Sequence, residues 1–462
     1  VTRLTSDVTN IQNAVSTGMR PFGRSPVMLI FATSFAFRIN STLALVFLVA
    51  LPTLAVLLIL IIINVGPLYG RMQSAIDQVN RCIQENLTAI RVVKSYVRGD
   101  YEVEKFGVVN ENLKSESEKA FGTAVLNMPA MQFVMYGTIL GILLIGGRLI
   151  NEGQMMIGQL TSFLSYVLLI LNSLMMMSNV FLLMTRSLAS AERIMEVIDE
   201  KIDITDENAK DIAVAKGEIE FDHVWFKYKD TAKEYVLSDV SFHIKPGQTV
   251  GIIGQTGSSK TTLVQLIPRL YDVTKGEVKI DGINVKEYPV RHLRDAVAMV
   301  LQKNTLFSGS LIDNLRWGNE NATLDEIKEA CQIACVDEFV DRLADGYDTG
   351  MGQEGVNVSG GQKQRICIAR AILKKPKVLI LDDSTSAVDT ATEAKIRSGL
   401  AEKLPDMTKI IIAQRISSVR HADQIIIMDR GHVEAIGTHE SLLRDNQIYQ
   451  EIYASQKEGA DL

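Results

Sequence analysis

The residues best suited to chemistry in this 462-residue chain lie between an apolar run, Val250-Gly251-Ile252-Ile253, and a segment of helical pattern that starts at Thr262. A loop between a strand and a helix can turn successive backbone amides and the helix N-terminus onto phosphate groups. A lysine in the loop adds positive charge, and a hydroxyl can reach Mg²⁺. The candidate phosphate-binding residues are Gly254, Gln255, Thr256, Gly257, Ser258, Ser259, Lys260, Thr261 and Thr262.

This loop departs from the usual phosphate-binding pattern at one position. The pattern places Gly directly before the Lys, whereas this chain has Ser259. The serine adds a Cβ atom where the backbone must approach phosphate closely. Taken alone, the stretch could also be a Gly- and Ser-rich loop that binds nothing, so its interpretation depends on the motifs that follow it.

A second strand-like run, Val378-Leu379-Ile380-Leu381-Asp382, ends in a carboxylate. A buried strand of this kind can place Asp382 beside a phosphate loop, where it would hold Mg²⁺ together with Thr261. An Asp at an ordinary turn is the alternative when the run is considered alone. About 120 residues after a phosphate-binding loop, the run instead predicts the second half of a nucleotide site.

A third motif lies between these two and opens a helical segment that extends to about Leu373. A serine hydroxyl, backbone amides exposed by glycines and the helix dipole together form an anion-binding site of their own. The residues of this motif are Ser359, Gly360, Gly361 and Gln362.

The elements around these motifs divide the chain by composition. The chain is 47% hydrophobic, and Leu43–Val65 runs for 23 residues without a charge, enough to cross a ~30 Å hydrocarbon core at ~1.5 Å per residue. Each short turn between spans carries one basic residue, Arg38 or Arg148, which places the long polar stretch between them in the cytoplasm. The core of a large soluble protein is the alternative. The predicted spans are Ser25–Phe37 with residues upstream, Leu43–Val65, Ala120–Ile150 and Ile157–Met184.

Beyond the spans, strand and helix patterns alternate, which predicts an α/β domain. Net charge is −6, and the second half carries more acidic than basic residues, so nucleic acid is not an expected partner. The four cysteines form no disulfide or zinc spacing and are expected to be reduced. We predict a membrane domain over residues 1–200, a linker over 201–217, a nucleotide-binding domain over 218–455 and a tail over 456–462.

The three motifs, in this order and spacing, resemble an ATP-binding cassette (ABC) domain, and with membrane helices ahead of it the chain resembles a half-transporter of the ABC exporter class. The resemblance covers essentially the whole chain. It implies an all-α membrane domain with four of six spans present, fused to an α/β P-loop cassette with a helical subdomain. The first two spans and the first cytoplasmic coupling helix are expected upstream of Val1.

The resemblance also implies roles for single residues. Tyr228 matches the aromatic residue that stacks on adenine, and Gln302 matches the loop glutamine that touches Mg²⁺ and senses the membrane domain. Asp389 ends the loop Ser386-Ala387-Val388-Asp389, which crosses to the partner cassette in this family. Residues 90–101 resemble the second coupling helix, and residues 349–355 resemble the exporter segment near the coupling helices. ATP and Mg²⁺ are the implied ligands.

Three departures from the family pattern predict how the site works. The general base is usually Glu, but here it is Asp383, one methylene shorter, and the switch histidine is replaced by Gln414. With Ser259, all three departures fall on the Walker side, whereas the signature at Ser359–Gln362 is intact. We therefore expect a heterodimer in which this chain holds ATP in a degenerate site and lends its signature to the partner's hydrolytic site.

The expected activity is export of apolar or amphipathic small molecules across the cytoplasmic (inner) membrane, driven by ATP. Few ionisable residues lie in the spans, which argues against a charge-lined pore. Methionines at 175–177 and 184 suit either a pocket for varied apolar cargo or plain packing. The alternatives are an ATP-gated channel or regulatory subunit, and a slow homodimeric exporter of lipid or peptide.

Overall fold

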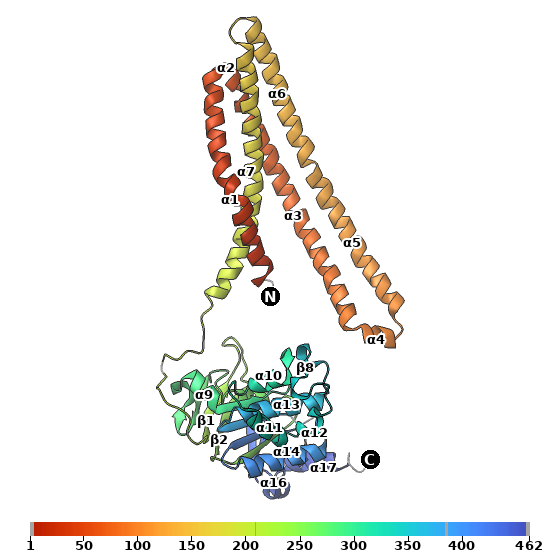
Figure 1. The fold of residues 1–462 in the computed structure, drawn as a ribbon, viewed down its shortest axis with the longest axis vertical. Helices are drawn as coiled ribbons and strands as arrows, with labels where there is room; N and C mark the ends of the chain where they lie inside the picture. Colours follow the sequence, from red (N-terminus) through yellow and green to blue (C-terminus); the bar gives the residue numbers. More distant parts are fainter. Residues whose placement is uncertain (1–3, 208, 384–386, 459–462) are drawn as a thin grey trace. The chain divides into compact units, whose positions relative to one another are not determined.

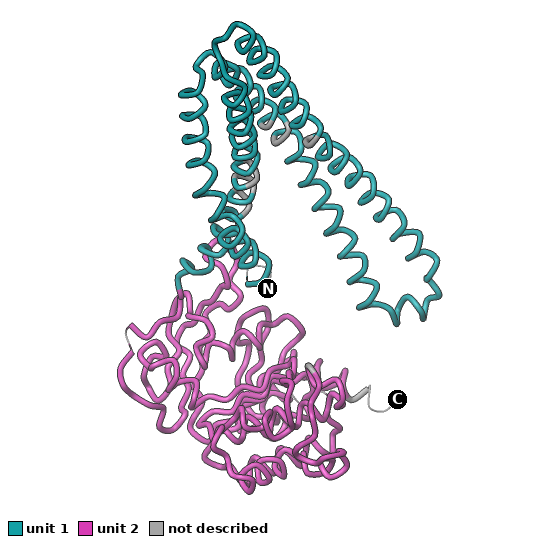
Figure 2. Tube along the Cα trace, turned by 45° about the horizontal axis from the view of Figure 1, so that its top comes forward, with its two compact units in different colours: residues 1–201 teal, residues 202–462 magenta. Residues whose placement is uncertain are grey.

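The computed structural model describes residues 4–207, 209–383 and 387–458. They belong to two compact units, Val1–Lys201 and Ile202–Leu462, drawn in teal and magenta in Figure 2. The boundary between the units follows the last long helix and precedes the first strand.

The first unit is helical (Figure 1). Prolines lie inside two of its long helices, Pro21 and Pro26 in the first and Pro52 and Pro67 in the third, and the helical backbone continues through each of them. The helices are α1 (Ser6–Ile39), α2 (Ser41–Ala44), α3 (Val46–Thr88), α4 (Ile90–Ser95), α5 (Gly99–Val125), α6 (Asn127–Asn151) and α7 (Ile157–Ile198).

These helices pack in an order set by short turns. Helix α1 lies along α7, and α3 returns beside α5 and α6 (Figure 1). Asn40 ends α1 and accepts a hydrogen bond from the Leu43 amide at 3.0 Å, which caps α2 and fixes the first turn. Phe47 and Phe163 stack at 5.6 Å between ring centroids within a shared apolar core. The short helix α4 closes the far end of the α3–α5 hairpin.

By length and composition, two stretches of the described residues could cross a membrane, Gly99–Asn151 and Ile157–Met177, and Ser41–Leu57 is a shorter apolar stretch. They include the third and fourth predicted spans in part or whole. The first two predicted spans lie in α1 and in α2–α3, and some side chains of the second lie outside the described residues. The first predicted span and the residues upstream of it form one continuous helix, α1.

The second unit is built on two larger sheets. A six-stranded sheet has the order β12-β11-β3-β10-β9-β6, parallel except for β12, and a four-stranded antiparallel sheet has the order β2-β1-β4-β5. A third pair joins β7 and β8. The strands are β1 (Ile219–Phe226), β2 (Leu237–Ile244), β3 (Thr249–Ile253), β4 (Lys275–Ile280), β5 (Ile283–Asn284), β6 (Val297–Val300), β7 (Gly309–Ser310), β8 (Gly350–Met351), β9 (Val378–Asp382), β10 (Thr408–Ile412), β11 (Gln424–Asp429) and β12 (His432–Gly437).

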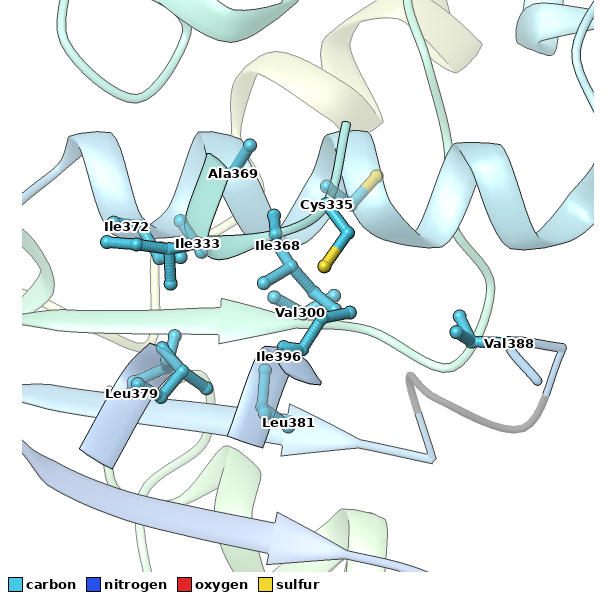
Figure 3. Packing of buried hydrophobic residues seen from close by; sticks show 14 of the residues in the cluster. Val300, Ile333, Cys335, Ile368, Ala369, Ile372, Leu379, Leu381, Val388 and Ile396 are labelled. Carbon is cyan, nitrogen blue, oxygen red and sulfur yellow. The ribbon is translucent and has the colours of Figure 1, made fainter. Parts of the chain in front are cut away.

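The parallel strands are buried on both faces because alternate residues enter two different cores. Ile380 and Ile410 face the four-stranded sheet, whereas Leu379, Leu381 and Ile411 face helices. Figure 3 shows this second core, where Leu379 and Leu381 lie among side chains of α13 and α14. The helices of this unit are α8 (Lys260–Gln265), α9 (Val290–Ala296), α10 (Leu311–Arg316), α11 (Leu324–Ile333), α12 (Asp337–Val340), α13 (Gly360–Leu373), α14 (Thr390–Lys403), α15 (Ile416–Val419), α16 (His439–Asp445) and α17 (Gln447–Glu458), with 3₁₀ turns η2 (Val285–Glu287), η3 (Gly346–Asp348) and η4 (Gln353–Gly355).

Candidate nucleotide-binding site

The predicted site residues come together where four parallel strands end. The phosphate loop follows β3, Asp382 ends β9 with Asp383 directly after it, Gln414 follows β10, and Gln302 follows β6. Because carboxyl ends of parallel strands share one edge of a sheet, ligands bind in the crevice outside that edge. A hollow of about 300 Å³ lies there, lined by Thr256, Gly257, Ser259, Lys260, Thr261, Thr262, Gln302, Asp382, Asp383, Ile412 and Gln414.

The backbone of the phosphate loop is tightly constrained at its first residue. A Cβ atom on Gly254 would lie 2.1 Å from the carbonyl oxygen of Met428, so only glycine fits. At the other end, Ser259 has φ 71° and ψ 22°, a left-handed conformation that favours glycine. The serine is therefore strained in the position where the family pattern has glycine.

Lys260 lies in the loop with its charge directed at the loop's own backbone. Its Nζ atom donates to the carbonyl oxygens of Gly254 and Gln255, both at 2.8 Å, and to Ser258 Oγ at 3.2 Å. Burial lowers the pKa of the Lys260 ammonium, and the neighbouring carboxylates of Asp382 and Asp383 oppose that shift. An anionic phosphate would be a stronger partner for this ammonium than neutral carbonyls are.

Asp382 is 2% exposed. Its Oδ1 atom accepts a hydrogen bond from Thr261 Oγ1 at 3.1 Å, while Oδ2 has no hydrogen-bond partner among the described residues. Burial raises the pKa of Asp382, and the bond from Thr261 opposes the rise. A buried carboxylate oxygen beside a hydroxyl is a donor set that Mg²⁺ accepts together with phosphate oxygens, so these residues fit the metal.

Asp383 and Gln414 bind each other across β9 and β10. Gln414 Nε2 donates to Asp383 Oδ2 at 2.9 Å, and Gln302 also hydrogen-bonds the Asp383 carboxylate. Burial raises the pKa of Asp383, and these two hydrogen bonds and Lys260 oppose the rise. Gln302 thus reaches the base position, which the sequence did not predict.

Tyr228 lies half-exposed at the edge of the phosphate loop. Its hydroxyl forms a hydrogen bond with Thr262 Oγ1 at 2.9 Å, and its ring packs edge-to-face with the rings of Phe226 and Tyr271 at 4.9 and 5.1 Å between centroids. The ring is therefore held in a fixed plane next to α8, an arrangement that suits a flat base. Tyr271 was not predicted, because no motif marks it.

The residues of the third motif lie apart from those that line the hollow. Ser359 Oγ accepts from the Gln362 amide at 3.3 Å, and Gln362 Oε1 accepts from the Ser359 amide at 2.9 Å, a capping box that starts α13. A Cβ atom on Gly361 would lie 2.7 Å from the carbonyl oxygen of Ala387. The side chains of Ser359 and Gln362 are thus satisfied locally, and Gly360 remains exposed at the helix start.

Asp389 caps the helix after this contact. Its Oδ1 atom accepts from the Thr392 amide at 3.0 Å at the start of α14, and this bond lowers its pKa. The Ala387 amide donates to Gln364 Oε1 at 3.0 Å, which ties the loop before Asp389 to α13. Ser386 lies outside the described residues.

Comparisons with known proteins agree with this arrangement. A family model of the ABC transporter transmembrane region matches residues 1–174, and one of the ABC transporter matches residues 237–386. An uncharacterized ABC transporter ATP-binding protein of Bacillus subtilis, YfiB, is 40% identical over all of this chain and 80% of its own length. A putative multidrug export ATP-binding/permease protein of the same organism, YgaD, is 34% identical over 99% of this chain and 79% of its own length.

Two further relatives extend the comparison. An ATP-dependent lipid A-core flippase of Desulfotalea psychrophila is 33% identical over 99% of this chain and 79% of its own length. A solved structure of a bacterial Atm1-family ABC exporter with ATP bound matches with a TM-score of 0.81 and 26% identity, over 98% of this chain and 82% of that one. The predicted fold, a helical membrane domain fused to an α/β ATP-binding cassette, is confirmed. The chain belongs to the ABC transporter family, as an exporter half-transporter with its ATP-binding domain in the cytoplasm.

Proposed function

We propose that this chain is the subunit of a heterodimeric exporter that holds ATP in a degenerate site and donates its signature to the hydrolytic site of its partner. The exported cargo is an apolar or amphipathic small molecule. The observation that carries the proposal is the pair formed by Asp383 and Gln414 at the base and switch positions.

The chemistry of this pair argues against fast hydrolysis. A general base must come within ~2.6–3.2 Å of the proton that it removes, and an aspartate reaches about one bond length less far than a glutamate. Here the carboxylate accepts a hydrogen bond from a neutral amide, which cannot carry the charge of a protonated histidine. The site would therefore bind ATP well and orient the attacking water poorly.

The other residues of the site would hold the nucleotide in place. Tyr228 would stack on the base, Lys260 and the loop amides would hold the phosphates, and Thr261, Asp382 and Gln302 would hold Mg²⁺, which when bound neutralises charge on the phosphates. Ser359, Gly360 and Gly361, with Gln362 capping their helix, would act on the nucleotide of the partner. Asp389, which caps α14, would fix the end of the loop that crosses between cassettes.

The ATPase rate of this chain tests the proposal. We expect little hydrolysis by the chain alone, rapid hydrolysis with its partner subunit, and at least a tenfold gain at its own site in Asp383→Glu combined with Gln414→His. Rapid hydrolysis by the unmodified chain alone would favour a homodimer and overturn the heterodimer.

A transport assay separates the alternatives to a small-molecule pump. In inside-out vesicles, ATP should drive accumulation of an apolar dye against its gradient. A gated channel or regulatory subunit would give equilibration without accumulation. Accumulation of a labelled lipid or peptide in place of the dye would point to the other cargo classes, of which the flippase relative offers one example.

A further inference from the structure

The C-terminal helix reaches the backbone on both sides of the switch residue. Gln456, near the end of α17, donates from Nε2 to the carbonyl oxygen of Gln414 at 2.7 Å. Its Oε1 atom accepts from the Ile416 amide at 2.8 Å. One side-chain amide thus holds two backbone groups in place, the carbonyl of Gln414 and the amide of Ile416.

The bond from the Ile416 amide replaces a helix cap that the local sequence does not supply. Helix α15 begins at Ile416, and its N-cap residue, Arg415, makes no side-chain capping bond. The first amide of such a helix needs an acceptor, and Gln456 provides it. Because Gln414 immediately precedes Arg415, fixing this backbone also fixes the origin of the Gln414 side chain, which reaches Asp383.

Helix α17 is held in place by contacts other than Gln456. Tyr449 is fully buried, and its hydroxyl bonds His439 Nδ1 at 2.7 Å. Asn446 accepts from the Tyr449 amide at 2.8 Å, and Ile452 and Tyr453 pack against the same core. Loss of the Gln456 side chain should therefore leave the helix in place while it frees the backbone at Gln414.

We propose that Gln456 is a positioning residue for the nucleotide site, which holds the Gln414 side chain on the Asp383 carboxylate. Gln414 joins α17 to the hollow, because its backbone carbonyl accepts from Gln456 and its side chain donates to Asp383. The first readout below rests on the proposed retention of ATP at this site, and the second does not.

Three variants of the assembled transporter in lipid nanodiscs test this inference. Gln456→Ala removes both bonds. Gln456→Glu keeps an acceptor for the Ile416 amide but places a carboxylate against the Gln414 carbonyl, so it isolates the second bond. Gln450→Ala is the matched control, because Gln450 lies on the same helix and bonds the carbonyl oxygens of Leu443 and Arg444 instead.

The first readout is release of preloaded radiolabelled ATP during a chase with unlabelled ATP. We expect the slow phase to accelerate about three- to tenfold in Gln456→Ala and Gln456→Glu, as for the loss of one or two hydrogen bonds, and to stay unchanged in Gln450→Ala. In a Gln414→Ala background, Gln456→Ala should not accelerate ATP release further. If Gln456→Ala acted through a general loss of stability, it would accelerate release by the same factor in both backgrounds. Unchanged release in both Gln456 variants would overturn the inference.

The second readout is hydrolysis by the restored site, Asp383→Glu with Gln414→His. Adding Gln456→Ala should lower kcat about three- to tenfold with KM unchanged, because the switch side chain would be held less firmly. An unchanged kcat would contradict the positioning role of Gln456, even if the ATP-release experiment shows a slow phase. Absence of any slow phase in the unmodified transporter would contradict the proposed ATP retention alone, and kcat would still decide the role of Gln456.

Discussion

At the scale of single residues, Ser259 stands where the family pattern has glycine, and this substitution affects the stability of the cassette. Its left-handed backbone conformation costs an L-residue ~1–2 kcal/mol, which glycine would not incur. A glycine also gives the unfolded chain more conformational freedom, which lowers the stability of the folded state by ~0.5–1 kcal/mol. We expect Ser259→Gly to stabilise the cassette by about 0.5 kcal/mol, measured by thermal unfolding, and to tighten ATP binding.

The control for this prediction is the glycine at the other end of the loop. Gly254→Ala should destabilise the cassette strongly and abolish ATP binding, because its Cβ would meet the Met428 carbonyl oxygen at 2.1 Å. A lower unfolding temperature in Ser259→Gly would mean that the serine side chain stabilises the loop by more than its strain costs.

At the scale of elements, the start of α11 depends on one carboxylate. Glu326 accepts from the Thr323 amide at 2.9 Å in a capping box and from Lys375 Nζ at 2.6 Å, and the bond from Lys375, with those from Thr323, lowers its pKa to about 2. A carboxyl group whose pKa falls on folding adds stability above its unfolded pKa, near 4.5, and loses it as the pH falls toward 2.

Glu326→Ala should therefore lower the unfolding temperature at pH 7, and the difference from the parent chain should narrow progressively below about pH 4.5. Glu326→Gln keeps an acceptor for the Thr323 amide but loses the charge, so its unfolding temperature at pH 7 should lie between those of Glu326→Ala and the parent chain. Thermal unfolding of the transporter across this pH range is the measurement. A difference that stays constant with pH would assign the effect to helix propensity.

The elements that carry motifs could be predicted from sequence more completely than their contacts. The apolar run Val378–Asp382 is a strand with the predicted bounds, and α13 ends at the predicted Leu373, because local patterning decides such elements. The convergence of Lys260 with Asp382 also follows from parallel strands. Gln456 could not be found, because its partner lies 42 residues earlier and no local pattern records a bond between distant segments.

At the scale of the whole molecule, the path of the chain predicts which ends of the helices face the cytoplasm. The cassette is cytoplasmic, and α7 leads to it through residues 199–218. We therefore predict that the turn before α7, at residues 152–156, lies on the outer side, and that α4, at the far end of the α3–α5 hairpin, lies in the cytoplasm. All four cysteines are buried, so the folded parent chain should react little with a bulky thiol reagent.

Single cysteines placed at these two ends test this topology. Gln154→Cys should react with a membrane-impermeant maleimide in spheroplasts or protoplasts, because the residue is exposed in the turn predicted to face outward. Tyr96→Cys, at a residue 75% exposed beside α4, should react only after the membrane is permeabilised. The parent chain controls for background labelling. Reaction of Tyr96→Cys from outside would contradict the predicted orientation of the α3–α5 hairpin.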